Sequence, residues 1–128
     1  MAQPFLKWAG GKRQLMKKIE LRLPDDLDSY NTYVEPFIGG GAVLFHLLEK
    51  YDFDNVHISD LNPELILCYE ILKLDAKSVI KTLNKLIDEY PEEIDDRKIV
   101  YYKMRADWNK EVDKIGSLSK SKKIKRVS

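Results

Sequence analysis

A glycine-rich turn at residues 35–41, with the sequence EPFIGGG, restricts the possible folds of this chain more than any other segment. The stretch leading into it, residues 33–37, is rich in β-branched and aromatic residues and predicts a buried strand. Residues 42–51 then predict a helix. Because glycines turn tightly and leave no Cβ between the main chain and a ligand, the turn is typical of a ligand-binding loop. A turn without a ligand is the alternative, since glycine commonly punctuates loops.

A second strand pattern, residues 55–60, ends on an acid and is followed by a helix pattern over residues 63–74 that opens with proline. The order strand, glycine turn, helix, strand, acid, helix predicts a βαβ unit with parallel strands. Residues 13–23 predict an earlier helix. Residues 79–90 and 99–108 predict later helices, and no further strand pattern follows. Since a doubly wound core uses about four to seven strands, we expect only part of an α/β domain.

Composition narrows the class of protein. The 128 residues are 44% hydrophobic and 34% charged, as in a globular domain, and a net charge of +1 argues neither for a nucleic-acid coat protein nor for an acidic tail. Cations nevertheless gather at the two ends of the chain. The single cysteine, Cys68, excludes an intramolecular disulfide and fits a reducing compartment, so we expect a cytoplasmic protein. No long apolar run or secretory signal pattern occurs, and we expect no membrane association.

Two common nucleotide-binding motifs do not fit the sequence. The glycine turn does not fit the dinucleotide fingerprint, because Leu44 stands where a third small residue is needed. A phosphate loop ending at Gly11 and Lys12 fails as well, because Leu6 and Arg13 replace the glycine and the Ser or Thr that it requires. The residues therefore favour neither a nicotinamide dinucleotide nor a nucleoside triphosphate.

Asp60 ends the second strand pattern and lies 19 residues beyond Gly41. Nucleoside-binding α/β folds place an acid at this position on the ribose hydroxyls, and two acceptor oxygens suit a vicinal diol. The alternative is that Asp60 caps the helix that opens at Pro63, and both roles can coexist. The basic segment of residues 7–12 is compact enough to hold a carboxylate or a phosphate, with a solvated N-terminal arm as its alternative.

Other polar residues give weaker signals. His46 and His57 have no second ligand at metal spacing, so we expect no metal site. Residues 117–128 hold four serines and five cations with little apolar content, which predicts a solvated, poorly ordered tail. Its cations could contact DNA phosphates, and a solvated face is the alternative.

Three segments together resemble the Dam-type family of DNA adenine-N6 methyltransferases. They are residues 5–13 (FLKWAGGKR), 33–43 (YVEPFIGGGAV) and 58–65 (ISDLNPEL). Their order and spacing match the family, and residues 101–109 (YYKMRADWN) resemble the helical stretch that follows. The resemblance covers roughly residues 4–110, and three ordered motifs are far more specific than one glycine-rich loop.

The resemblance implies an α/β chain with a partial Rossmann-like, S-adenosylmethionine-dependent methyltransferase fold and a following helical segment. It implies a cofactor-binding βαβ portion in residues 1–74, a helical segment leading to the DNA-recognition region in residues 75–116, and a basic flexible tail in residues 117–128. Methyl transfer would be to adenine in double-stranded DNA, the partner of the complete enzyme. The other partners that the resemblance suggests are the missing C-terminal half or a companion restriction endonuclease.

Site residues follow from the resemblance by position. A cationic sulfonium is favoured near a carboxylate and an aromatic face, and the cofactor carboxylate near a lysine and a helix N-terminus. Trp8 and Lys12 would contact the cofactor, and Asp60 would hold the ribose diol with Leu61 beside the adenine. The pocket for the methionine part and the sulfonium would be formed by Glu35, Pro36, Phe37, Gly39, Gly40 and Gly41.

The sequence departs from the family in one respect. Family members continue into a strand ending in an Asp-Pro-Pro-Tyr type motif that binds the flipped adenine, and this sequence contains no Asp-Pro dipeptide. We therefore expect an N-terminal portion with no catalytic residue of its own, inactive as it stands. The alternatives are a non-catalytic cofactor- or DNA-binding remnant that regulates or assembles with a partner, and a methyltransferase acting on RNA or a small molecule.

Overall fold

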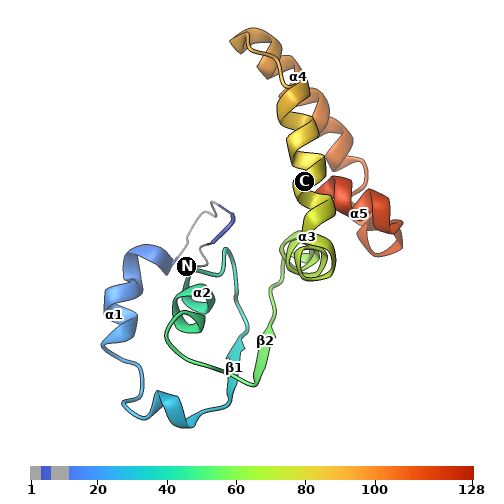
Figure 1. The fold of residues 1–128 in the computed structure, drawn as a ribbon. Helices are drawn as coiled ribbons and strands as arrows, with labels where there is room; N and C mark the ends of the chain where they lie inside the picture. The colour runs from blue at the N-terminus through green and yellow to red at the C-terminus, as the bar shows by residue number, and fades with distance from the viewer. Residues whose placement is uncertain (1–3, 7–11) are drawn as a thin grey trace. The chain divides into compact units, whose positions relative to one another are not determined.

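The structure is a computed structural model that describes residues 4–6 and 12–128. The chain divides into two compact units, Met1–Leu65 and Ile66–Ser128. Figure 1 traces the order of the elements along the chain. The described elements are η1 (Lys12–Leu15), α1 (Met16–Glu20), η2 (Leu27–Ser29), β1 (Thr32–Glu35), α2 (Ala42–Leu48), β2 (Asn55–Ile58), α3 (Pro63–Glu89), α4 (Ile94–Asn109), η3 (Val112–Ser117) and α5 (Lys120–Val127).

The first unit is built on a two-stranded parallel sheet (Figure 1). Strands β1 and β2 pair in register from Thr32 opposite Asn55 to Glu35 opposite Ile58. The pairing continues one step past the strands, because the Ser59 N–H donates to the Glu35 carbonyl over 3.0 Å. The predicted parallel βαβ arrangement is confirmed, with strands one or two residues shorter than the sequence pattern. The prediction that the first strand is buried is wrong, because successive side chains of a strand point to opposite faces, and Glu35 is buried while Val34 is 62% exposed.

Helix α2 supplies much of the core of the first unit. Its apolar residues Val43, Leu44 and Leu47 fall on one face at helical spacing and are buried, together with Ile38 and Leu65. Burying an aliphatic side chain of this size contributes about 1.5–3 kcal/mol. This small core holds the loops that follow both strands in a fixed position.

Helix α3 bends at Asp75, whose backbone angles (φ −158°, ψ 57°) are not helical. The Asp75 Oδ1 atom accepts the backbone N–H of Ser78 over 3.2 Å, as a capping residue does at the start of a helix. The bend therefore separates two consecutive helical stretches within α3. It directly follows the end of the predicted helix of residues 63–74 and precedes the predicted start of the next helix at residue 79.

The second unit has its own apolar core. Leu67, Ile71 and Val79 of α3 and Ile115 of η3 are buried against one another. Partly buried residues of α5, Ile124 and Val127, pack on this cluster. The last helix is therefore held to α3 and η3 by apolar contacts.

The C-terminal residues differ from the poorly ordered tail that the sequence predicted. They form α5, and the Ser119 side chain accepts the Lys122 N–H at its start. Arg126 is only 4% exposed, because its guanidinium lies 4.3 Å from the centre of the Trp108 ring and donates to the Trp108 carbonyl over 2.9 Å. The low apolar content of this segment gave no sign of the helix, because one of the contacts that hold it uses an arginine. The planar guanidinium of Arg126 stacks on the Trp108 ring and also donates a hydrogen bond.

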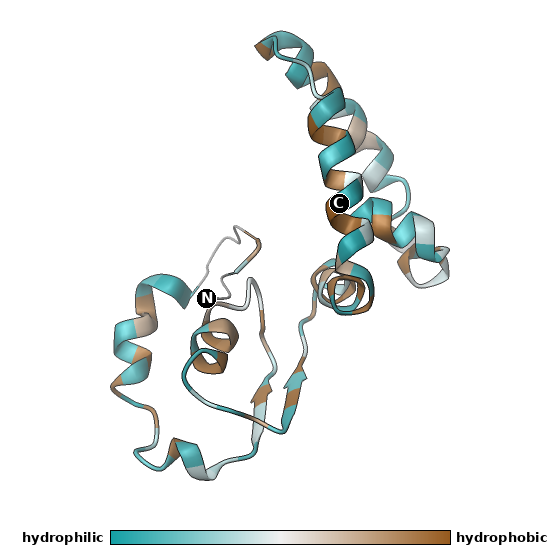
Figure 2. Cartoon of the chain, in the orientation of Figure 1, coloured by the Kyte–Doolittle hydropathy of each residue, from teal (hydrophilic) through white to brown (hydrophobic). Residues whose placement is uncertain are grey.

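Helix α4 is exposed apart from the half-buried Val100 and has no buried residue. Figure 2 shows apolar residues spread along it among polar ones. No helix within the described residues is both long and apolar enough to cross a membrane. The boundary between the compact units precedes the predicted functional boundary after residue 74, and that functional division stays a prediction.

Candidate functional site

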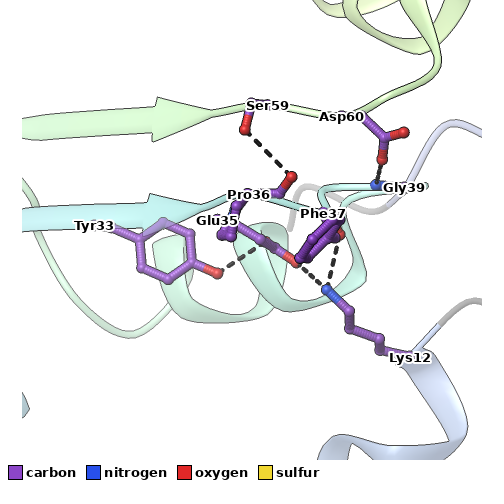
Figure 3. A network of polar contacts seen from close by, with 8 residues as sticks. All are labelled: Lys12, Tyr33, Glu35, Pro36, Phe37, Gly39, Ser59 and Asp60. Atoms are coloured by element: carbon purple, nitrogen blue, oxygen red, sulfur yellow. Dashed lines mark hydrogen bonds and ion pairs between the residues drawn. The ribbon is translucent and has the colours of Figure 1, made fainter.

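The loops that follow β1 and β2 meet at the carboxyl ends of the two parallel strands (Figure 3). The Ile38 N–H donates to the Ser59 carbonyl over 3.0 Å, and the Ser59 hydroxyl donates to the Pro36 carbonyl over 3.2 Å. These bonds join the EPFIGGG turn to the end of β2. In parallel sheets this edge is where ligands bind.

Asp60 joins the same two loops through its side chain. Its Oδ2 atom accepts the Gly39 N–H and its Oδ1 atom accepts the Asn62 N–H, each over 2.9 Å. The Asn62 and Gly39 N–H groups lower the pKa of Asp60 below its usual range, and the positive charge of Lys12 adds to the effect. Asp60 therefore carries a negative charge at neutral pH.

The cap of α3 is provided by Asn62 and not by Asp60. The Asn62 Oδ1 atom accepts the Glu64 N–H over 2.9 Å, and the helix begins at Pro63. The capping alternative for Asp60 is therefore replaced by a structural bond to the glycine turn. Because each carboxylate oxygen has a second acceptor position, Asp60 can still accept hydroxyl hydrogens from a ligand.

The glycine turn uses backbone conformations that favour glycine. Gly39 has φ 53° and Gly41 has φ 75°, both in the left-handed region. The Gly41 carbonyl accepts the Phe45 N–H over 2.9 Å and so begins α2. Gly40 between them is buried. The turn thus depends on its glycines for its shape, whatever it binds.

Glu35, at the end of β1, is only 5% exposed, and both of its carboxylate oxygens have donors. The Lys12 ammonium donates to Oε1 over 2.7 Å, and the Tyr33 hydroxyl donates to Oε2 over 2.8 Å. The Lys12 ammonium also donates to the Phe37 carbonyl over 2.9 Å (Figure 3). A buried carboxylate needs such partners, because an unpaired charge away from water is costly.

Two large apolar side chains flank this edge of the sheet and face solvent. Phe37 is 66% exposed and Leu61 is 91% exposed. Exposed apolar groups beside fixed carboxylates suit a ligand that has both a flat apolar part and hydroxyl or cationic groups. Of the predicted site residues, Trp8 lies outside the described part of the chain, and the others lie in or next to these two loops.

Two residues of the network were missed by the sequence analysis. Tyr33 precedes Glu35 by two positions in β1, so the strand period of two places both on one face of the sheet. That spacing could have identified it. Ser59 has no comparable signal, because its role depends on the position of the turn after β1.

The two histidines lie in different elements, His46 in α2 and His57 in β2. His46 bonds through Nε2 to Oε1 of Glu20 over 2.8 Å, and His57 is exposed on β2. Within residues 4–6 and 12–128, no three or more His, Cys, Asp or Glu side chains are grouped so that they could hold a metal ion.

Comparison with known proteins identifies the protein family to which this chain belongs. Residues 8–125 match the D12 class of N6 adenine-specific DNA methyltransferases, and the chain belongs to this family. The predicted resemblance to adenine-N6 methyltransferases is thereby confirmed. The helices and small parallel sheet of the structure are compatible with an α/β methyltransferase.

Several relatives share much of this sequence. The chain is 51% identical over 111 residues to the type II methyltransferase M.MjaIII of Methanocaldococcus jannaschii. The matched stretch covers 84% of this chain and 38% of that protein. It is 34% identical over 123 residues to the type II methyltransferase M1.LlaDCHI of Lactococcus lactis, covering 95% and 39%. It is 35% identical over 109 residues to the DNA adenine methylase of Escherichia coli K12, covering 85% and 35%. The chain thus spans well under half the length of these relatives.

Proposed function

We propose that this chain is the S-adenosylmethionine-binding portion of a DNA adenine-N6 methyltransferase, with part of a Rossmann-like fold. The observation that carries the proposal is the bond between Gly39 and Asp60 at the carboxyl ends of two parallel strands. It places a glycine turn and an ionised carboxylate side by side, where an α/β sheet binds a nucleoside.

The chemistry of the side chains present fits this cofactor. Asp60 has acceptor positions for the ribose hydroxyls, and the exposed rings and methyl groups of Phe37 and Leu61 suit the adenine and the region of the sulfonium. The bound cofactor supplies a methyl group on a positively charged sulfur. Trp8 remains a predicted contact.

Charge supports the same assignment. Two carboxylates, Glu35 and Asp60, and one ammonium, Lys12, belong to the network at this edge of the sheet. Two negative charges against one positive charge favour a cation between the loops, and opposite charges attract most strongly where water is partly excluded. Lys12 itself would face the carboxylate of the cofactor.

The acceptor in this proposal is adenine in DNA, in line with the family and with the relatives named as DNA adenine methylases. In such a transfer the exocyclic nitrogen of adenine gains the methyl group and loses a proton, while the bond between methyl carbon and sulfur breaks. We propose that the 128 residues bind the cofactor without completing this transfer, because the sequence has no Asp-Pro dipeptide from which an Asp-Pro-Pro-Tyr motif could be made.

Calorimetric titration of S-adenosylmethionine into the 128-residue protein tests the binding step. Asp60→Asn should weaken binding by about tenfold or more, because it removes the charge and one acceptor oxygen. The exposed Asp54 gives a matched control, since Asp54→Asn makes the same change elsewhere in the unit. Failure of the folded wild-type protein to bind would overturn the proposal.

Transfer is tested separately with cofactor that carries a tritiated methyl group. We expect no incorporation into unmethylated duplex DNA above that seen without protein. Incorporation into DNA would show that catalytic residues lie within these 128 residues, contrary to the proposal. Incorporation into RNA instead would show that the acceptor has been assigned wrongly.

A further inference from the structure

The family resemblance assigns no role to Tyr33, whose hydroxyl contacts the network of the candidate site through Glu35. We propose that Tyr33 is a positioning residue for the cofactor site and that it holds Lys12 in place through Glu35. The inference rests on the proposed function, because the site that Lys12 serves is the proposed cofactor site. Tyr33 itself needs no contact with the cofactor.

The geometry is a chain of three side chains. The Tyr33 hydroxyl donates to Oε2 of Glu35 over 2.8 Å, and the Lys12 ammonium donates to Oε1 of the same carboxylate over 2.7 Å. Both carboxylate oxygens are therefore engaged, one on each side. Figure 3 shows Tyr33 and Lys12 on opposite sides of Glu35. Rotation of the carboxylate would break both bonds at once.

The first member of this chain is itself fixed. The Tyr33 ring packs against the Phe53 ring at 5.5 Å between centres, and the Tyr51 ring packs against Phe53 at 6.4 Å. Burial and the neighbouring Glu35 carboxylate raise the pKa of Tyr33 above its usual range. Its hydroxyl therefore stays protonated and acts as a donor throughout the neutral range.

The last member of the chain reaches the ligand loop. The Lys12 ammonium also donates to the Phe37 carbonyl over 2.9 Å, so its position affects the turn between Phe37 and Gly39. Gly39 is in turn bonded to Asp60. Loss of the Tyr33 hydroxyl leaves a buried acceptor on Glu35 without this donor, which favours a different carboxylate orientation and a displaced ammonium. The effect of losing the Tyr33 hydroxyl is therefore transmitted to the proposed cofactor site through Glu35 and Lys12.

A double-mutant cycle on cofactor affinity tests this inference. Tyr33→Phe removes only the hydroxyl and keeps the ring against Phe53, and we expect it to weaken S-adenosylmethionine binding about fivefold. Lys12→Met should weaken binding about tenfold. The double variant should resemble Lys12→Met alone and fall well short of the product of about fiftyfold, because without Lys12 there is nothing left for Tyr33 to position.

The control is Tyr51→Phe, which removes a hydroxyl from another half-buried ring that packs on the same phenylalanine. It should leave affinity unchanged, whereas Tyr33→Phe should also lower the thermal midpoint, because it leaves a buried acceptor on Glu35 without this donor. A purely structural role for Tyr33 would lower stability without any coupling to Lys12. Multiplying effects in the double variant, or equal weakening by Tyr51→Phe, would overturn the inference. Absence of binding by the wild type would overturn the proposed function and this inference with it.

Discussion

The backbone N–H of Gly39 donates to Oδ2 of Asp60 over 2.9 Å, between residues that are 21 positions apart in the chain. The other oxygen of Asp60 accepts the Asn62 N–H over the same distance. One carboxylate thus fixes both the glycine turn after β1 and the entry to α3. This arrangement makes Asp60 a structural residue even before any ligand binds.

The acid sensitivity of the first unit should depend on Asp60. Its pKa is lowered in the folded protein, so its contribution to stability is complete above the unfolded pKa of about 3.9 and is lost as the pH falls through the folded value. Asp60→Asn should be less stable than the wild type at pH 7. It should also lose less further stability below about pH 4. Urea denaturation at a series of pH values measures both effects, and acid profiles that run parallel would contradict the prediction.

A side chain at Gly41 should lower the stability of the protein. Its φ of 75° is a left-handed conformation, so Gly41→Ala should lower the free energy of unfolding by about 1 kcal/mol or more. Gly116 is the matched control, because a Cβ added there meets nothing within 4 Å. Gly116→Ala should be close to neutral. Urea denaturation followed at resolved amide signals of each unit compares them, and equal losses would argue against the conformational explanation.

Arg126 should hold α5 to the rest of the second unit. Arg126→Ala removes the cation–π contact with Trp108 and the bond to its carbonyl, with an expected loss of about 2 kcal/mol. Arg126→Lys should recover little of this, because lysine lacks the planar group that stacks on the ring. The exposed neighbour Lys125 provides the control through Lys125→Ala. Unfolding followed by circular dichroism measures the stability of each variant. Equal losses of stability in Arg126→Ala and Lys125→Ala would contradict the prediction.

Asp75 should stabilise the bend in α3 in two separable ways. It accepts the Ser78 N–H and forms an ion pair with Lys120 over 3.0 Å, and these partners lower its pKa, Lys120 most strongly. Asp75→Asn keeps a good capping residue but removes the charge, whereas Asp75→Ala removes both contributions. We therefore expect thermal midpoints in the order wild type, Asp75→Asn, Asp75→Ala. Lys120→Ala should match Asp75→Asn, and a larger loss from Lys120→Ala would reverse the assignment.

The positions of the elements in the first unit could be predicted because they depend on local patterns. Tyr33 and Val34, followed by Pro36, predict the strand that the structure has at residues 32–35. Pro63 predicts the start of α3. The family followed from three short motifs in the right order. Helix α5 could not be predicted in this way, because its stability depends on Arg126 meeting Trp108, 18 residues earlier in the chain.

Local sequence patterns were sufficient to predict the parallel βαβ unit, the glycine turn and an acid at the end of the second strand, since periodicity and turn chemistry act over a few neighbouring residues. The contacts between those residues depend on the tertiary structure. It placed Asp60 on the N–H of Gly39, left the capping of α3 to Asn62, and buried Glu35 between Tyr33 and Lys12. Two of these contacts, between Gly39 and Asp60 and between Lys12 and Glu35, join residues that are more than twenty positions apart. The first of them forms only when strand pairing brings the two loops together.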